Sequence, residues 1–426
     1  MQPAEIESLI PNAAGLFPVF AIFVKAASIP FDYQYHIKMK HQHFVRTLYM
    51  LLLATTVNSC QLGRYVWYGR SDLLSHHEIF PYRKLYASTD ETFMFPFSVT
   101  APAHPAINQV IEKYNLMIKT LGIGENLLDG SYESFETFLQ SKETAAFIII
   151  QRDSILYENY FGRYSRESIL PSFSIAKSIL SVLIGCAIDD GLIQSVHEPV
   201  TNYIPELKEL GFEEVSIRDL LQMTSGIDFE ENYANPFGDV ARIYFGTNLR
   251  RAMLNTRLGT ETERRFYYNS GDSQLLGMVL AKALNDKSIT RYMQEKLWTP
   301  LGMEFDGSWS LDRKNGLEKT FCCINTRAID LAKIGRLMLH GGSWNGRQIV
   351  SEQWVKTSTK TDTTYGSESY FQYHWWLIRG SISATGHGGQ ILYIYPPKEL
   401  IIVRLGNDRG GINWNMWSGA IARLLE

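Results

Sequence analysis

Segments with the pattern of β-strands lie at two distant places in this chain, and this spacing limits the folds that it can adopt. The apolar run Ala145–Ile150, four polar residues and then Ile155–Tyr157 predict two strands joined by a tight turn. A second hairpin is predicted from Ile391–Tyr395 and Leu400–Leu405, which flank a pair of prolines. The patterns between the two hairpins are mainly helical. Strands at both ends with helices between them predict one α+β domain that carries an inserted helical subdomain.

Four segments have the apolar spacing of helices, namely residues 174–188, 274–284, 328–339 and 414–425. The first of them is apolar on most of its surface, which predicts a buried helix, and Gly191 marks its end. These helices and the two hairpins account for most of the apolar patterning in the second half of the chain.

The segment before the first hairpin has a different character. Residues 61–140 are rich in aromatic and turn-forming residues, and we expect an irregular lead-in that wraps the main domain. The main domain is expected to span residues 141–426. No internal repeat or low-complexity tract suggests a different organisation.

The composition is typical of a globular protein. Hydrophobic residues make up 45% of the 426 residues, which is enough for a large core. The 41 basic and 44 acidic residues give a net charge of −3, and without a basic run we expect no nucleic-acid partner. The four cysteines show neither a C-x-x-C pair nor the spacing of a zinc site, so neither a disulfide framework nor a metal is expected. Nothing in the sequence indicates an oligomeric state.

Two apolar stretches lie near the amino terminus, at residues 15–24 and 48–57, and each is shorter than the roughly 20 residues of a membrane span. Basic residues precede the second stretch and Cys60 follows it, an order that resembles a bacterial lipoprotein signal. Translation from Met39 would make this stretch an export signal. An uncleaved membrane anchor and a buried hydrophobic helix are the alternatives. We therefore expect residues 1–60 to hold an export signal or anchor, and the protein to lie in the bacterial cell envelope, in the periplasm or facing it from the membrane.

One S-x-x-K sequence occurs in the chain, from Ser174 to Lys177, where a strand-rich segment gives way to the predicted buried helix. Residues three apart share one face of a helix, so the lysine amine can approach the serine hydroxyl. A serine becomes a good nucleophile when a neighbour takes its proton, and desolvation favours the neutral lysine that can take it. Free N–H groups at the start of the helix can hold a tetrahedral oxyanion. The alternative is an N-capping serine with an exposed lysine.

S-x-x-K is also the nucleophile motif of penicillin-binding proteins and serine β-lactamases, in which two further motifs follow. Residues 265–277 resemble the Phe-x-Tyr-Ser-Asn-x-Gly-Tyr-x-Leu-Leu-Gly segment of class C β-lactamase-like enzymes, where the tyrosine assists proton transfer. Tyr267 preserves the Tyr-x-Asn spacing, whereas Tyr268 preserves the distance to Leu-Leu-Gly, and we choose Tyr268 as the catalytic residue. In that register Ser270 replaces the family's asparagine at the substrate. This replacement resembles the 6-aminohexanoate-dimer (nylon-oligomer) hydrolase branch; core aromatics before a helix are the alternative.

The segment Thr-Gly-His-Gly-Gly-Gln, which ends at Gln390, resembles the Lys-Thr-Gly strand motif in its His-x-Gly form. Glycines such as Gly389 would let a substrate lie against the strand edge. The resemblance implies that the backbone N–H of Gln390 completes an oxyanion hole with that of Ser174. It also implies that His387 donates a hydrogen bond to the substrate or to Tyr268. A glycine-rich turn with a structural histidine is the alternative.

The resemblance extends over roughly residues 145–426. It implies a β-lactamase/transpeptidase-like fold, with an antiparallel sheet flanked by helices and an inserted, mostly helical subdomain. It further implies a two-step acyl transfer on Ser174, without a cofactor, whose partner is a small-molecule amide or ester. Because this scaffold hosts many activities, a class C-type β-lactamase or D-amino-acid peptidase is the enzymatic alternative. A catalytically silent envelope protein that binds a ligand is the alternative from another class. The adjacent Cys322 and Cys323 have no role in this interpretation.

Overall fold

An antiparallel sheet of seven strands lies at the centre of the computed structural model, which describes residues 61–69, 72–88, 92–97, 135–260, 264–285 and 287–425. The strand order is β3-β2-β13-β12-β11-β10-β9. Their bounds are β2 Thr144–Gln151, β3 Ser154–Tyr160, β9 Phe371–Gln372, β10 Trp375–Ile378, β11 Ser381–Gly386, β12 Gln390–Tyr395 and β13 Leu400–Gly406. Strands β2 and β13 are buried along their whole length, as expected of a sheet that is covered on both faces.

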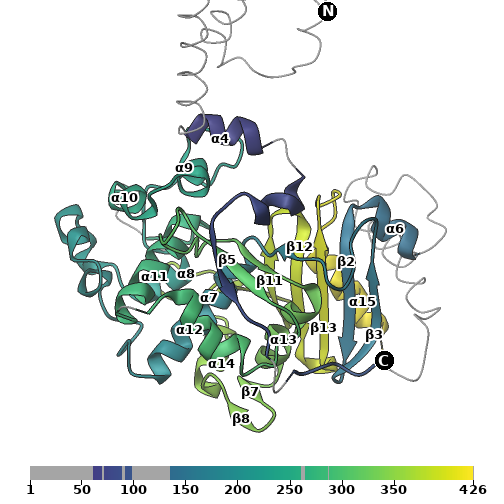
Figure 1. Cartoon of the computed structure of the whole chain (residues 1–426). Coiled ribbons are helices and arrows are strands. Elements are labelled where there is room, and N and C mark those ends of the chain that lie inside the picture. The colour runs from purple at the N-terminus through teal and green to yellow at the C-terminus, as the bar shows by residue number, and fades with distance from the viewer. Residues whose placement is uncertain are drawn as a thin grey trace, which may run out of the picture. The chain divides into compact units, whose positions relative to one another are not determined.

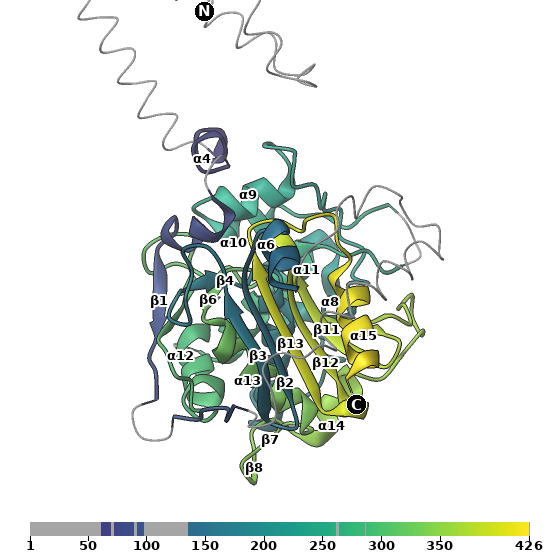
Figure 2. The same ribbon diagram turned by 90° about the vertical axis from the view of Figure 1, so that its right-hand side faces the viewer.

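Helices cover both faces of this sheet. Helices α6 (Phe135–Ser141) and α15 (Trp414–Leu424) pack on one face, against β2 and β12 (Figure 2). Helices α7 (Ile175–Asp189) and α13 (Ala328–Leu339) pack on the other face, against β11, β12 and β13 (Figure 1). The apolar spacing of these helices explains this burial, since their apolar faces pack on the sheet and, for α7, on α11 as well.

The remaining helices lie to one side of the sheet, beyond α7 (Figure 1). They are α8 Ile217–Gln222, α9 Asp239–Phe245, α10 Leu249–Leu254, α11 Ser270–Ala283, α12 Ile289–Met293 and α14 Glu352–Ser358. All six fall between β3 and β10 in the sequence, which makes them the inserted helical part. The α+β architecture and this insertion are confirmed. The predicted hairpins and the four predicted helices correspond to β2–β3, β12–β13, α7, α11, α13 and α15.

A second sheet, which the sequence patterns did not predict, has the order β1-β5-β6-β4. Its strands are β1 Tyr82–Leu85, β4 Leu170–Pro171, β5 Gly307–Ser310 and β6 Ile324–Thr326, and a two-stranded hairpin joins β7 Ser343–Trp344 to β8 Arg347–Gln348. These strands have two to four residues each, which is too few for the period-2 pattern that marks a strand in a sequence.

The predicted lead-in contributes regular structure where it is described. Helix α4 (Gln61–Tyr68) packs on α9, the short helix η1 (Leu73–Glu78) contacts β4, and β1 pairs with β5. The predicted export signal or anchor of residues 1–60, with its alternative start at Met39, lies outside the described residues. No helix within the described ranges is long and apolar enough to cross a membrane.

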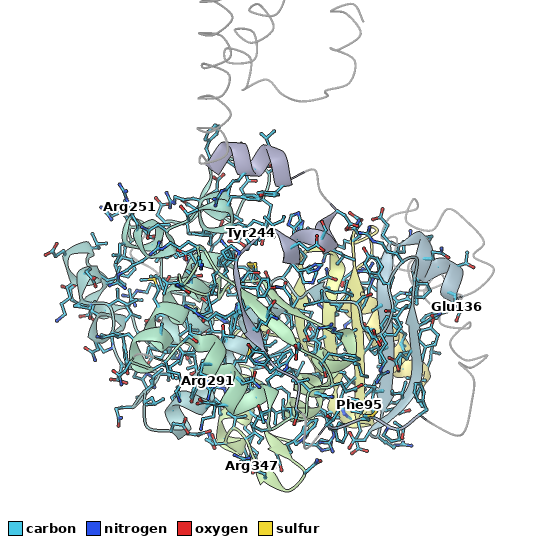
Figure 3. The ribbon with its side chains drawn as sticks, in the orientation of Figure 1. Phe95, Glu136, Tyr244, Arg251, Arg291 and Arg347 are labelled. Atoms are coloured by element: carbon cyan, nitrogen blue, oxygen red, sulfur yellow. A yellow bond between two sulfur atoms is a disulfide. The ribbon has the colours of Figure 1, made fainter. Side chains whose placement is uncertain are left out.

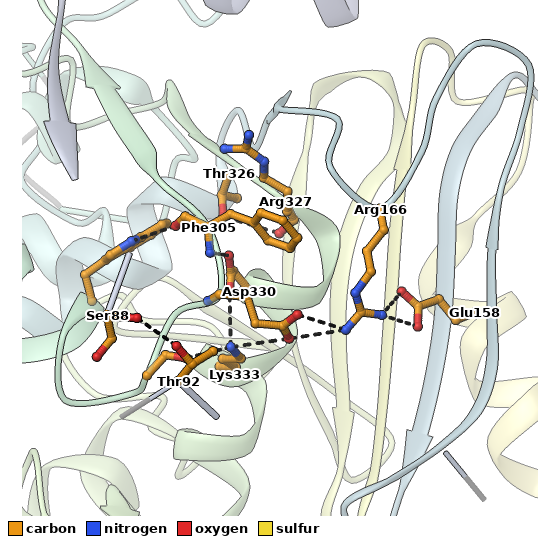
Figure 4. Close-up of polar contacts among 12 residues, drawn as sticks. Ser88, Thr92, Glu158, Arg166, Phe305, Thr326, Arg327, Asp330 and Lys333 are labelled. Atoms are coloured by element: carbon orange, nitrogen blue, oxygen red, sulfur yellow. Dashed lines mark hydrogen bonds and ion pairs between the residues drawn. The ribbon is translucent and has the colours of Figure 1, made fainter. Parts of the chain in front are cut away.

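Buried ion pairs connect the edge of the large sheet to α13 (Figure 4). The guanidinium of Arg166 pairs with Glu158 on β3 and, at 3.0 Å, with Glu304. The ammonium of Lys333 on α13 lies 3.5 Å from Glu304 and 3.0 Å from Asp330. Each buried charge therefore has an opposite charge beside it, which offsets the cost of removing it from water.

Candidate active site

Ser174 lies in the turn that joins strand β4 to the start of α7. Phe173, directly before it, has a φ of +45°, which is uncommon for a residue with a side chain. The backbone N–H of Ser172 donates to Ile324 of β6, so the small second sheet fixes the turn from one side. This turn leaves Ser174 at the first turn of a buried helix, with its side chain only half-buried.

Lys177 brings its amine to the Ser174 hydroxyl, as the S-x-x-K spacing predicts. Its Nζ lies 2.9 Å from Ser174 Oγ, 3.2 Å from Ser270 Oγ and 2.8 Å from the carbonyl oxygen of Phe321. The lysine side chain is almost fully buried. A protonated amine donates all three bonds; a neutral amine can donate to Ser270 and Phe321 and turn its lone pair to the Ser174 hydroxyl. The arrangement therefore suits a base that accepts the proton of Ser174.

Ser270 connects Lys177 to a carboxylate that the sequence analysis did not single out. Its hydroxyl donates to Glu231 at 2.8 Å, and its backbone N–H donates to the same carboxylate at 2.7 Å. The hydroxyl of Tyr233 donates to Glu231 at 2.6 Å. A continuous chain of hydrogen bonds thus runs from Ser174 through Lys177 and Ser270 to Glu231.

The two candidate tyrosines occupy different environments. The ring of Tyr268 faces Lys177, with the Nζ atom 5.2 Å from the ring centroid, and stacks on Trp376. Tyr267 is 51% exposed, and its hydroxyl accepts a hydrogen bond from the backbone N–H of Glu231. The structure therefore brings Tyr268, and not Tyr267, beside the Lys177 amine. The catalytic role of Tyr268 stays a prediction.

The glycine-rich turn after β11 divides its predicted site residues between two environments. The ring of His387 lies against Phe173 and stacks on Tyr233, at centroid distances of 5.9 and 5.3 Å. A Cβ on Gly386 would lie 2.6 Å from the carbonyl oxygen of Ser172, so only glycine lets β11 approach the Ser174 turn this closely. The Gly386–His387 end of the turn therefore lies beside the nucleophile.

Gly389 and Gln390 lie on the other side of that turn. Gly389 has a φ of +77°, and a Cβ there would meet the side chains of Arg404 and Trp414. The amide of Gln390 is buried and exchanges two hydrogen bonds with the backbone of Gly406. Neither residue lines the pocket at Ser174. The structure therefore does not place Gly389 or the Gln390 side chain in this pocket, and the roles of the Gly389 strand edge and of the Gln390 backbone N–H stay predictions.

Arg404 holds the turn in place from behind. This fully buried guanidinium donates to the carbonyl oxygens of Gly388 and Gly389 at 3.0 and 2.8 Å and lies over the ring of Trp414. Burial lowers its pKa to about 9. Because its donors reach backbone carbonyls that only the fold brings together, no local sequence pattern marks it as a positioning residue.

A pocket of about 310 Å³ opens beside Ser174. Its wall comes from the amino-terminal α4 and η1, from helix α9, and from loop and turn residues around Ser174. The lining residues are Tyr65, Gly69, Leu73, His76, Phe173, Ser174, Tyr233, Val240, Ala241, Tyr244, Phe245, Ser270, Phe321, Cys322, His387 and Asn407. Of the predicted site residues, Ser174, Ser270 and His387 lie in this wall.

His76 and Tyr244 connect the amino-terminal wall of the pocket to α9. Figure 3 shows Tyr244 beneath α4. Its hydroxyl lies 2.8 Å from Nδ1 of His76, and the backbone of Tyr68 forms a hydrogen bond with the same imidazole. Burial lowers the pKa of His76 to about 4, so the ring is neutral near pH 7. Sequence reasoning missed both residues, because they lie 168 positions apart and belong to no motif.

The sulfur atoms of Cys322 and Cys323 are bonded to each other in the segment that follows Phe321. The sequence analysis expected no disulfide framework and assigned this adjacent pair no role, so the bond is a feature that it did not predict. A bond between neighbours closes no loop of the chain, which is why cysteine spacing gave no signal for it. Cys186, in contrast, is a free buried thiol whose pKa burial raises to about 12, as expected of an unreactive cysteine.

Comparisons with known proteins agree with this geometry. The family model described as Beta-lactamase matches residues 134–415. A 6-aminohexanoate-dimer hydrolase from Paenarthrobacter ureafaciens is 27% identical over 295 residues, which cover 64% of this chain and 74% of that protein. A Bacillus anthracis structure provisionally assigned as a 6-aminohexanoate-dimer hydrolase has a TM-score of 0.68 at 19% identity, over 83% of this chain and 91% of the other. A family VIII carboxylesterase has a TM-score of 0.55 at 16% identity, over 77% of this chain and 100% of the other.

Proposed function

Since the chain belongs to the β-lactamase family and is a serine hydrolase, we propose that it cleaves a linear amide or carboxylic ester through an acyl-enzyme on Ser174. The observation that carries the proposal is the 2.9 Å separation between Lys177 Nζ and Ser174 Oγ at the start of a buried helix. A serine and a base within hydrogen-bond reach form the minimal apparatus of nucleophilic acyl transfer.

The proposed reaction has two steps. In the first, Ser174 Oγ attacks the carbonyl carbon while Lys177 takes the hydroxyl proton, and the leaving group departs with a proton from Lys177 or Tyr268. In the second, Lys177 or Tyr268 takes a proton from water as the water oxygen attacks the acyl carbonyl carbon. The bond from that carbon to Ser174 Oγ then breaks, Oγ takes the proton back, and the acid leaves. The backbone N–H of Ser174 stabilises the oxyanion in both steps. A second donor is best supported at Gly386–His387, because that part of the turn contacts Ser172 and Phe173, which directly precede Ser174.

Ser270 stands where the segment of class C β-lactamase-like enzymes has an asparagine. This replacement resembles the 6-aminohexanoate-dimer hydrolase branch, and it therefore favours a linear substrate over a β-lactam. The names of the relatives point to the same bond types, since one is a hydrolase of a linear amide dimer and another is a carboxylesterase. A class C-type β-lactamase activity is the alternative outcome of the test below.

The test compares the full-length protein with Ser174→Ala on p-nitrophenyl acetate, p-nitrophenyl butyrate and nitrocefin. We expect ester hydrolysis that Ser174→Ala abolishes, with little turnover of nitrocefin. Fast nitrocefin turnover with rapid deacylation would instead identify a β-lactamase. A folded protein with no Ser174-dependent reaction on any substrate would defeat the enzymatic proposal and favour a silent ligand-binding protein.

The same assay distinguishes the two tyrosines. Tyr268→Phe is expected to lose most of the turnover, whereas Tyr267→Phe is expected to keep it, because only Tyr268 lies beside Lys177. The reverse result would assign the proton-transfer role to Tyr267.

A location in the bacterial cell envelope, with membrane contact through the amino-terminal segment, is part of the proposal. Its support is the order of basic, apolar and cysteine residues before Gln61. Cell fractionation of the natural chain and of Cys60→Ser tests it. Recovery of both in the cytoplasmic fraction would contradict the envelope location.

A further inference from the structure

Among the described residues that line the pocket beside Ser174 there is no Asp, Glu, Lys or Arg side chain. The two histidines in this lining are His76 and His387, and burial lowers the pKa of both, which favours their neutral forms. The part of the lining that comes from η1, α9 and the turn before α7, here called the inner wall, is mainly apolar. It consists of Leu73, His76, Phe173, Val240, Ala241, Tyr244 and Phe245. A charged chain end placed there would lose its hydration without gaining an opposite charge.

The polar groups of the inner wall are occupied within the protein. One ring nitrogen of His76 faces the Tyr244 hydroxyl, and the imidazole has a second hydrogen bond with the backbone of Tyr68. The imidazole is neutral because burial holds its pKa near 4, and burial raises the pKa of Tyr244 above its usual value. This pair therefore ties α9 to η1 rather than offering a binding site for a charge.

The amine of Lys177 contacts Ser174 and Ser270 at the edge of the pocket, where it serves the proposed reaction. Two further cations near the pocket are bonded to the end of helix α9. The buried ammonium of Lys319 donates to the carbonyl oxygens of Ile243 and Tyr244 at 3.1 and 2.7 Å. The guanidinium of Arg64 donates to the carbonyl oxygen of Phe245 at 3.2 Å. Both satisfy carbonyl groups at the helix terminus, so neither faces the pocket as a free partner for an anion.

Part of the wall lies outside the segment that the family model matches, which begins at residue 134. Leu73 is the central residue of this part. A Cβ on Gly388 would lie 2.6 Å from Leu73 Cδ2, so Leu73 connects the amino-terminal wall to the turn that carries His387. The residues of the proposed reaction thus belong to the segment that the family model matches. Part of the apolar lining of the pocket comes from the residues before that segment.

From these observations we infer that the pocket binds an uncharged, mainly aliphatic chain of the substrate on one side of the scissile bond, and that Leu73 and Ala241 set its charge and length preference. A volume of about 310 Å³ has room for about ten water-sized groups, which is enough for a short aliphatic chain such as that of a hexanoyl group. This inference rests on the proposed hydrolase function and names the substrate class of the same site.

The experiment measures kcat/KM of the full-length protein for two series of esters. The first series varies the acyl chain of p-nitrophenyl esters: hexanoate, the adipate monoester with its free carboxylate, and 5-(trimethylammonio)pentanoate. The second series keeps acetate as the acyl group and places the same three kinds of chain end, uncharged, anionic and cationic, on the alcohol. Its hydrolysis is measured from the acid that is released. We expect the uncharged chain to exceed both charged chains by about 100-fold or more in at least one series. Equal rates for charged and uncharged chains in both series would overturn the inference.

Two variants test the assigned residues in the series that shows the preference. Leu73→Arg, at a half-buried position, is expected to raise the relative kcat/KM for the carboxylate-ended ester at least tenfold, whereas Leu73→Gln should not. Ala241→Leu is expected to lower kcat/KM for hexanoate while that for acetate is kept. Ala283→Leu, at the far end of α11, is its matched control. Unchanged preferences in both Leu73→Arg and Ala241→Leu would overturn the assignment.

The two proposals fail in different ways. If no ester is cleaved in a Ser174-dependent manner, the hydrolase function itself is wrong. If Ser174-dependent hydrolysis is present but does not distinguish charged from uncharged chains, the hydrolase function stands and the inferred substrate class is wrong.

Discussion

At the scale of single residues, the amine of Lys177 contacts both the Ser174 hydroxyl and the Ser270 hydroxyl. All three residues lie in recognisable sequence segments. Glu231 could not be predicted, because it reaches Ser270 across 39 positions from an irregular segment with no pattern of its own. Nevertheless it accepts hydrogen bonds from the Ser270 hydroxyl, the Ser270 N–H and the Tyr233 hydroxyl, so it fixes the group that contacts Lys177.

Glu231→Gln is therefore expected to lower kcat on a p-nitrophenyl ester by at least tenfold, because an amide cannot accept all three donors or take up a proton. Glu230→Gln is the matched control, since that neighbouring carboxylate bonds only the exposed Asn232 and Asn235. Steady-state kinetics of both variants are the measurement. A normal kcat in Glu231→Gln would show that the hydrogen-bond chain ends at Ser270.

A second residue-scale prediction concerns Asp272, which is fully buried on α11. Burial raises the pKa of this carboxyl to about 7 from 3.8, against the effect of hydrogen bonds from Ser225 and Asn269. At a pH between these two pKa values, Asp272 keeps its proton in the native protein and loses it in the unfolded chain. The contribution of Asp272 to the free energy of unfolding therefore falls as the pH rises from about 4 to 7.

Urea unfolding of the wild type and of Asp272→Asn at pH 4.5 and pH 7.5 tests this sign. The variant should gain stability relative to the wild type at the higher pH, by up to about 4 kcal/mol. Asp228→Asn, at an exposed position, should show no such difference. A constant difference between Asp272→Asn and wild type at both pH values would contradict the raised pKa.

At the scale of elements, the sequence predicted the long helices and strands whose apolar residues recur with one clear period. It did not predict the short ones. Helix α13 occupies Ala328–Leu339, the range that its apolar spacing predicts. Strand β6 has only three residues and β4 has two, so their pairing depends on contacts between distant segments rather than on local pattern. For the same reason β1 was not recognised within the lead-in, although its pairing with β5 makes the lead-in part of the fold.

Close packing of α7 leads to an element-scale prediction. A Cβ on Gly185 would lie 2.4–2.6 Å from three ring atoms of Trp354 on α14. Gly185→Ala should therefore lower stability by about 1–3 kcal/mol, although alanine favours helix. Gly419→Ala in α15 is the matched change, because the nearest atom there is the Tyr393 hydroxyl oxygen at 3.4 Å. It should be neutral or stabilise by up to about 1 kcal/mol.

Thermal unfolding of the two glycine variants beside the wild type provides the comparison. A lower melting temperature for Gly185→Ala and an equal or higher one for Gly419→Ala would support helix packing as the reason for glycine at position 185. A Gly185→Ala protein as stable as the wild type would mean that Trp354 moves aside at little cost.

At the scale of the whole molecule, the sequence predicted the catalytic domain but not the shape of its pocket. The motifs that mark the domain lie on the start of α7, the start of α11 and the end of β11, and the fold brings these three ends together. The pocket wall has a different origin, since η1 and α9 are held together by His76 and Tyr244. Such a contact follows from tertiary packing alone, so the motifs marked the serine hydrolase domain but not the residues that shape its pocket.

The central claim is that Ser174 forms a covalent acyl-enzyme, and active-site labelling tests it most directly. Wild type and Ser174→Ala are treated with a fluorophosphonate, and the intact mass and the modified peptide are determined by mass spectrometry. The account predicts one adduct per chain, located on Ser174, and no adduct in Ser174→Ala. An adduct that persists in Ser174→Ala, or a folded wild-type protein that does not react, would contradict it.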